Sequence, residues 1–239
     1  MKSHLLKVTV ILTLYIGSLS ATGQSTTLFY DDLDSFYATY VNSGKVDYKA
    51  ISQNPAALNT LIAQSVALRV SENDKQDYQA FWINAYNIHV IKSIIDFYPI
   101  TSPLDKKGFF DTVKHNIAGK NVTLNDIENN FLRAKFNDAR VHFVLVCGAL
   151  GCPPLINVAY RPELLEKQLT AQTKQAVNDK LFTRVGKSTV ELSQLFEWYK
   201  ADFEQNGSII DFLNVYLDAP LTKKTKIKFY SYDWKLNNK

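Results

Sequence analysis

The two cysteines of the chain, Cys147 and Cys152, are five residues apart in a segment that also contains His142. Two thiols can pair into a disulfide, bind a metal, or act as nucleophiles when a neighbouring base takes their proton. Gly148 and Gly151 make the loop between them flexible enough to bring the two side chains within disulfide reach. Two cysteines and one histidine lack the repeated ligand pairs that structural zinc prefers, so we expect no metal here.

A thiol nucleophile is one interpretation of this segment. Cys147 would attack, His142 would take its proton, and Glu128 or Asp126 would orient the imidazole. Alternation along an extended strand places His142 and Cys147 on opposite faces, so this pair needs a bulge or a turn near Cys147. Cys152 is the alternative nucleophile, because the two prolines after it suit the start of a short helix whose N-terminus stabilises a thiolate. In the plainer interpretation, His142 only bonds one of these carboxylates across the core.

The first 23 residues have the pattern of a secretory signal peptide. A short basic start precedes an apolar stretch over residues 8–19, and the small residues Ala21 and Gly23 come before Gln24. We therefore expect a single mature domain from Gln24 onward, exported to a periplasm or secreted. No later segment is long and apolar enough to span a bilayer, so we expect no membrane insertion after cleavage. An oxidising compartment favours pairing of the two cysteines.

The charge balance does not favour nucleic acid as a partner. The chain has 27 Lys and Arg against 23 Asp and Glu, and a signal peptide of 23 residues contains two of the lysines and none of the acids. Binding to nucleic acid needs clustered cations, and the densest basic run, residues 223–228, is typical of the solvated end of an edge strand. No glycine loop of the P-loop or Rossmann kind occurs, so we expect no nucleotide cofactor.

A long helix over about residues 74–98 is apolar nearly all round, which is typical of a buried central helix. The sequence from Ser71 to Asp74 resembles a capping box at its start. Two amides interrupt the apolar surface, Asn84 and Asn87, and their spacing puts them on one face. Because an unpaired buried amide costs about 1 to 3 kcal/mol, these two either tie the helix to neighbouring backbone or line a binding site.

The other elements are short and mostly local. Helices are predicted over residues 31–41, 55–68, 125–134, 161–178, 193–203 and 209–217. Hairpins are predicted around residues 118–119 and 186–187, with a buried strand over 141–146 and a closing strand over 226–234. Few, short strands clustered as hairpins indicate the α+β class: a mostly helical single domain with a small, mainly antiparallel sheet and a buried central helix.

Six segments resemble, in order, the blocks of the domain of unknown function 547 family. They are Phe81–Asn87, Thr123–Glu128, Arg140–Ala149, Cys152–Pro154, Phe196–Phe203 and Tyr232–Asn237. The resemblance runs from about residue 75 to the end of the chain. It implies a common fold and a recurring pattern that joins the cysteine loop to Glu128 and the helix of Asn84 and Asn87, but no established reaction. The family pattern has asparagine where this chain has Val146, which removes a polar group next to Cys147.

Two functional hypotheses follow. The first, which we favour, is a binding or scaffold domain whose aromatic-rich cleft is supported by a structural disulfide between Cys147 and Cys152, with Asn84, Asn87 and Asp126 as further candidates for binding. The alternative is a thiol-dependent hydrolase or acyltransferase acting on peptide-like amides. The two hypotheses require opposite states of the cysteines.

Overall fold

The structure is a computed structural model that describes residues 21–239, with side chains from residue 26 onward. Residues 1–20 of the predicted signal peptide lie outside the described part of the chain. Residues 21–23 begin helix α1 (Ala21–Tyr40). None of the helices within residues 21–239 has the length and apolar character needed to cross a bilayer.

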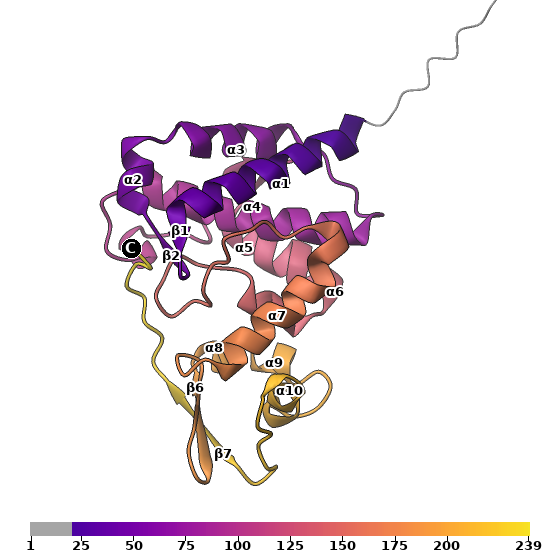
Figure 1. The fold of residues 1–239 in the computed structure, drawn as a ribbon, viewed down its shortest axis with the longest axis vertical. Helices are drawn as coiled ribbons and strands as arrows, with labels where there is room; N and C mark the ends of the chain where they lie inside the picture. Colours follow the sequence, from indigo (N-terminus) through magenta and orange to yellow (C-terminus); the bar gives the residue numbers. More distant parts are fainter. Residues whose placement is uncertain (1–20) are drawn as a thin grey trace, which may run out of the picture.

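The predicted central helix is α4 (Lys75–Asp96), and it is buried along nearly its whole length. Helix α3 (Ala56–Ala67) packs on α4, and α1 packs on α3, so that the three lie side by side in the upper part of Figure 1. Helix α2 (Tyr48–Gln53) also contacts α4. Because α4 is surrounded by other elements, its apolar side chains form the middle of the larger of two hydrophobic clusters. We call this cluster the first core.

At two helices, side chains near the N-terminus determine where the helix begins. At α4 the predicted capping box is wrong: Asp74, not Ser71, caps the helix, and its carboxylate accepts from the Asp77 amide at 3.1 Å. Ser71 lies one turn too early, where its hydroxyl accepts from the Asn73 amide. Thr123 does start a helix with a reciprocal capping box to Asp126. That helix is α5 (Leu124–Asp126), and it continues as the π-helix η2 (Ile127–Arg133) and α6 (Ala134–Phe136).

The predicted strand over residues 141–146 is wrong. Residues Ala139–Phe143 form the 3₁₀-helix η3, which Asp138 caps by accepting from the Arg140 amide at 2.9 Å. The backbone that follows bonds to the Asn87 side chain instead of to another strand: Asn87 donates to the Val144 carbonyl and accepts from the Val146 amide, each at 2.9 Å. A short apolar run indicates burial, and here burial does not require a strand.

A second core lies in the lower part of Figure 1. Its helices are α7 (Leu165–Asn178), with the 3₁₀ turn η4 (Pro162–Leu164) before it, α8 (Leu195–Trp198), α9 (Lys200–Phe203) and α10 (Ile209–Tyr216). Its strands are β5 (Thr183–Val185), β6 (Thr189–Ser193) and β7 (Lys226–Tyr230). The hairpin around residues 186–187 is confirmed, and β7 adds to β6 in the parallel direction as an edge strand.

The other strands form two small hairpins. Strand β1 (Val41–Asn42) pairs with β2 (Lys45–Val46), and β3 (His115–Ile117) pairs with β4 (Lys120–Val122), both antiparallel. The second hairpin turns at Ala118 and Gly119, both at positive φ, as the glycine in the sequence predicted. The predicted class is confirmed: a mostly helical α+β domain with small, mainly antiparallel sheets and a buried central helix.

The last residues of the chain return to the first core. The Val46 amide donates to the Asn237 carbonyl, and the Lys239 amide donates to the Val46 carbonyl, each at 3.0 Å. Figure 1 accordingly shows the C-terminus beside β1 and β2. On this path residues 232–237 pass the loop that contains the two cysteines. The closing segment therefore joins the second core to the site described next.

Candidate functional site

A cleft of about 610 Å³ draws its walls from both cores. Tyr86 and Leu145 come from the first core, Leu195 comes from the second, and Tyr232 packs against both. Seven of its eighteen lining residues are Phe, Tyr or Trp. The aromatic side chains in its lining are Tyr86, Phe109, Phe110, Trp198, Tyr199, Tyr232 and Trp234. An aromatic concavity with a few polar groups is the usual form of a small-molecule site.

Glu128, His142 and Cys147 all line this cleft, although they come from three different segments. Glu128 projects from the π-helix η2, His142 from the 3₁₀-helix η3, and Cys147 from the loop that follows. The expectation that strand alternation separates His142 from Cys147 does not apply, because this segment is not a strand. The structure thus brings the three predicted catalytic residues to one concavity.

The two cysteines form a disulfide, with their Cα atoms 6.2 Å apart. Cys147 is partly exposed in the cleft, and Cys152 is 6% exposed. The loop between them packs closely on both sides. A Cβ on Gly148 would lie 2.5 Å from the Ile94 side chain of α4, and a Cβ on Gly151 would lie 2.8 Å from the Tyr232 ring. The glycines therefore serve close packing of the disulfide loop as well as its turn.

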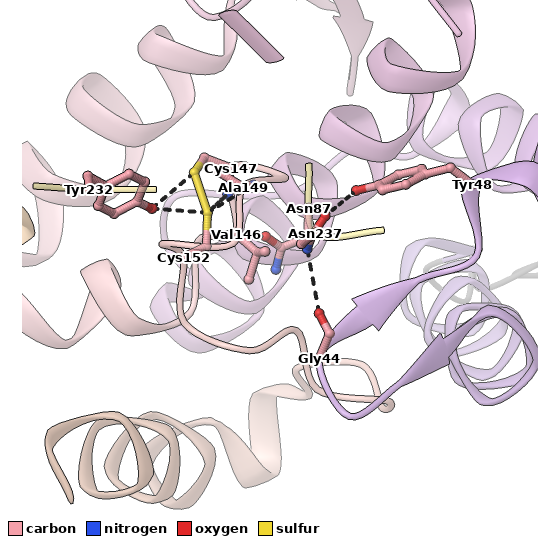
Figure 2. Close-up of a disulfide and its surroundings, with 9 residues drawn as sticks. All are labelled: Gly44, Tyr48, Asn87, Val146, Cys147, Ala149, Cys152, Tyr232 and Asn237. Atoms are coloured by element: carbon pink, nitrogen blue, oxygen red, sulfur yellow. Dashed lines mark hydrogen bonds between the residues drawn. A yellow bond between two sulfur atoms is a disulfide. The ribbon is translucent and has the colours of Figure 1, made fainter. Parts of the chain in front are cut away.

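Tyr232 places its hydroxyl against both sulfurs, as Figure 2 shows. The oxygen is 3.2 Å from Cys147 Sγ and donates to Cys152 Sγ at 3.1 Å. Burial raises the pKa of Tyr232 well above its usual value, and the nearby tyrosines and Glu128 add to the shift. The phenol is therefore neutral and can donate its proton to sulfur at any physiological pH.

His142 is bonded to Asp202, a carboxylate that we did not predict as its partner. The imidazole Nε2 donates to Asp202 Oδ2 at 2.7 Å, and Arg133 binds the same carboxylate through Nε at 2.6 Å and Nη2 at 2.9 Å. The hydrogen bond from His142, helped by Arg133, holds the pKa of Asp202 well below its usual range despite its partial burial. Asp202 is therefore ionised and orients the imidazole, the part that we expected Glu128 or Asp126 to play.

Tyr199 connects this ion pair to the cleft. Its ring stacks on His142 with the ring centroids 3.9 Å apart, and the Arg133 guanidinium lies 4.8 Å from the same centroid. Burial raises the pKa of the Tyr199 hydroxyl well above its usual value, and the charge of Glu128 and a hydrogen bond to it raise it further. Glu128 is only 8% exposed, so its carboxylate is a largely desolvated acceptor in the cleft wall.

The remaining predicted site residues do not line the cleft. The Asn84 amide bonds the Ala80 and Tyr160 carbonyls and the Tyr160 backbone amide, and Asn87 bonds residues 144 and 146 as described above. Both amides tie α4 to neighbouring backbone, one of the two alternatives that the sequence left open. Asp126 caps its own helix and forms an ion pair with Lys114 at 3.3 Å. Cys152 faces a different cavity, described below.

Five residues at the site were not singled out from the sequence as site residues: Arg133, Trp198, Tyr199, Asp202 and Tyr232. All but Arg133 fall inside the segments that resemble family blocks, so a signal for them existed. Within residues 21–239 no group of three or more His, Cys, Asp or Glu side chains is arranged to hold a metal ion.

Comparison with protein-family models matches residues 70–176 to the family described as "Protein of unknown function, DUF547". These residues belong to the domain of unknown function 547 family. The comparisons with curated proteins and with solved structures each found no match. The matched DUF547 segment contains Glu128, His142 and the disulfide, whereas Trp198 and Tyr232 follow it in the chain. The cleft is therefore built jointly by the DUF547 segment and the residues that come after it.

Proposed function

We propose that the protein is an exported binding domain, and that its cleft holds a small, peptide-like ligand with a flat apolar group. The observation that carries the proposal is the position of Trp198, which is 44% exposed at the cleft. Its ring stacks on Trp234 with centroids 5.9 Å apart and lies 5.1 Å from Tyr232. Such rigid aromatic side chains supply contact area at little entropic cost, which is why binding sites are rich in them.

The polar groups of the cleft complement this aromatic wall. Glu128 offers a carboxylate, Asn125 offers an amide, and Lys107 and Asp111 line the cleft as well. Glu128 is buried, whereas Asn125, Lys107 and Asp111 are exposed. A carboxylate accepts several hydrogen bonds, so a ligand donor can bind Glu128 beside its hydrogen bond to Tyr199. A peptide-like molecule with an aromatic or aliphatic side chain and free N–H groups meets both requirements.

Export is the second part of the proposal, and it is supported by the predicted signal peptide and by the disulfide. Mass measurement of the protein recovered from a periplasm or culture medium should give an N-terminus at Gln24. Removal of residues 21–23 shortens α1 by its first turn and leaves both cores intact. Recovery of the uncleaved chain in the cytoplasm would contradict this part.

Binding can be tested with a library of tripeptides that carry aromatic or aliphatic central residues, with tryptophan fluorescence as the readout. Trp198→Ala should weaken binding by about tenfold, because it removes a stacking surface from the site. Phe229→Ala is the matched control, because Phe229 is 37% exposed on the edge strand β7 and does not line the cleft. Equal effects of the two substitutions, or no peptide bound, would contradict the proposal.

Glu128→Gln tests the polar half of the site. The substitution keeps the size and shape of the side chain but removes its charge, so ligands that donate a charged group should bind about tenfold more weakly. Ligands without a positive charge should be affected much less. The ratio between the two classes measures the contribution of the carboxylate to specificity.

A second function, a thiol-dependent hydrolase or acyltransferase, has its own supporting observation: Cys147, His142 and Glu128 share one cleft. In the oxidised protein the Cys147 sulfur is bonded to Cys152 and is no nucleophile. Because His142 uses Nε2 for Asp202, proton transfer in the cleft would use Nδ1. Peptide p-nitroanilides should therefore be cleaved by the Cys152→Ala variant, which cannot form the disulfide, and not by Cys147→Ala. Two inactive but folded variants would remove this function and leave the binding proposal unaffected.

A further inference from the structure

The two sulfurs of the disulfide have unequal surroundings. Cys152 Sγ accepts hydrogen bonds from the Cys147 amide at 3.0 Å, the Ala149 amide at 3.4 Å and the Tyr232 hydroxyl at 3.1 Å. Within the described part of the chain, the Tyr232 hydroxyl is the one hydrogen-bond partner of Cys147 Sγ. Figure 2 shows these contacts converging on the lower sulfur. Negative charge would therefore be stabilised much better at Cys152 than at Cys147.

The two sulfurs also face different spaces. Cys147 lines the aromatic cleft of about 610 Å³, whereas Cys152 lines a separate cavity of about 580 Å³ beside Gly44 and Pro154. Because both sulfurs border a cavity, access alone does not decide where a thiol would react. The hydrogen-bond donors decide which sulfur is attacked. In thiol–disulfide exchange the sulfur that better carries negative charge is the better leaving group.

The donors around Cys152 do not depend on the disulfide for their positions. The Leu150 amide donates to the Lys235 carbonyl at 2.7 Å, and the Gly151 amide donates to the Asp233 carbonyl at 2.8 Å. The Asn237 amide in turn donates to the Gly148 carbonyl at 3.0 Å. The closing segment thus holds the loop from the outside. Opening the disulfide leaves these bonds in place, and the donors stay directed at Cys152.

We propose that the disulfide is a thiol-exchange site, at which a low-molecular-weight thiol enters the cleft and attacks Cys147. The thiolate of the incoming molecule forms a bond to Cys147 Sγ, the Cys147–Cys152 bond breaks, and its electron pair goes to Cys152 Sγ. Cys152 leaves as a thiolate that the two amides and the Tyr232 hydroxyl stabilise. The product is a mixed disulfide between the small thiol and Cys147.

A second molecule of the thiol completes the reduction. Its thiolate attacks the sulfur of the bound small molecule, and Cys147 leaves as a thiolate that takes a proton from solvent. Two small thiols are oxidised to one small disulfide, and the protein receives two electrons. The reverse sequence, with a small disulfide as the oxidant, closes the bond again. This exchange requires no peptide ligand in the cleft, so it is independent of the proposed binding function.

Reduced glutathione is a suitable probe for mapping the reaction. The folded, oxidised protein is incubated with it, quenched with acid, alkylated and digested, and the peptides are weighed by mass spectrometry. We expect glutathione on Cys147 and the alkyl label on Cys152, in roughly tenfold excess over the opposite arrangement. The opposite arrangement would overturn the proposal. A disulfide that opens only in denaturant would do so too.

A pair of phenol substitutions tests the role of the donors. Tyr232→Phe removes one donor from Cys152 and should slow reduction of the disulfide by roughly threefold. Tyr48→Phe is the matched control, because its buried hydroxyl donates to Asn237 at 2.8 Å beside the same loop but contacts neither sulfur (Figure 2). Equal rates for the two variants would overturn the assignment of Tyr232. If Tyr232→Phe does not fold, the mapping on the unsubstituted protein still decides which sulfur is attacked.

Discussion

Two regions of the molecule bury histidine side chains in different surroundings. One contains His142, and the other contains His89 and His115. His142 lies at the cleft, is bonded to the ionised Asp202 and stacks on Tyr199. His89 and His115 lie in the first core with their rings 5.1 Å apart. Within the described part of the chain, His89 Nδ1 and His115 Nε2 are buried and have no hydrogen-bond partner.

The electrostatic consequences differ accordingly. Burial holds the pKa of His89 well below its usual value and lowers the pKa of His115 to about 4, with smaller effects of neighbouring charges. These two imidazoles are neutral packing groups at physiological pH. His142 instead has the ionised Asp202 as its hydrogen-bond partner, at 2.7 Å. Among the buried histidines of residues 26–239, His142 is therefore the candidate for chemistry, because it lines the cleft and has a carboxylate as its hydrogen-bond partner.

The largest expected effect comes from removing that carboxylate. Asp202→Ala leaves both Arg133 and His142 without their partner in a region that is largely shielded from water, and we expect a loss of about 3 to 4 kcal/mol in unfolding free energy. Urea denaturation measures it. Asp211→Ala is the control, since Asp211 accepts from the Ser208 amide in the capping box at the exposed start of α10, and its loss should cost about 1 kcal/mol. Similar costs would mean that the ion pair at the cleft is not special.

The histidine pair in the first core should make stability depend on pH. The folded pKa of His115, about 4, lies below its ordinary value of 6.5, so the unfolded chain binds the proton first as pH falls. The contribution of a neutral His115 to the unfolding free energy is fully present above about pH 6.5. It is lost as pH falls toward 4, and the total loss is about 3 kcal/mol. His115→Gln should flatten the pH profile of urea denaturation by that amount. An unchanged slope would show that His115 is not the titrating group.

The smallest effect tests the hydrogen bond that links His89 to Ser65. His89 Nε2 is 3.0 Å from the Ser65 hydroxyl, and Ser65→Ala should reduce the unfolding free energy by about 1 kcal/mol. Ser35→Ala is a matched control, because its exposed hydroxyl bonds only the Asp31 carbonyl within α1. Thermal denaturation distinguishes the two. If Ser65→Ala lowered the unfolding free energy as much as Asp202→Ala does, the proposed difference between the cleft and the first core would be wrong.

Local patterns predicted much of the fold. The helices α3 and α4 and the hairpin turns at residues 118–119 and 186–187 all depend on patterns within a few residues. Residues 141–146 show where such reasoning ends. Their apolar character correctly indicated burial, but their partner is the Asn87 side chain, 57 and 59 residues away, and no local periodicity encodes that contact.

The sequence by itself determined that the two cysteines could pair, that Asn84 and Asn87 needed partners, and that the chain resembles the DUF547 family. Only the tertiary structure decided that Asp202 and not Glu128 or Asp126 bonds His142, and that the amides of the loop and Tyr232 direct their donors at Cys152 more than at Cys147. The physical reason is the same in both cases. The His142–Asp202 and Tyr232–Cys152 contacts join residues that are 60 and 80 positions apart, where the second core and the closing segment pack against the first core. The two amide contacts are local, but the closing segment holds the loop that forms them.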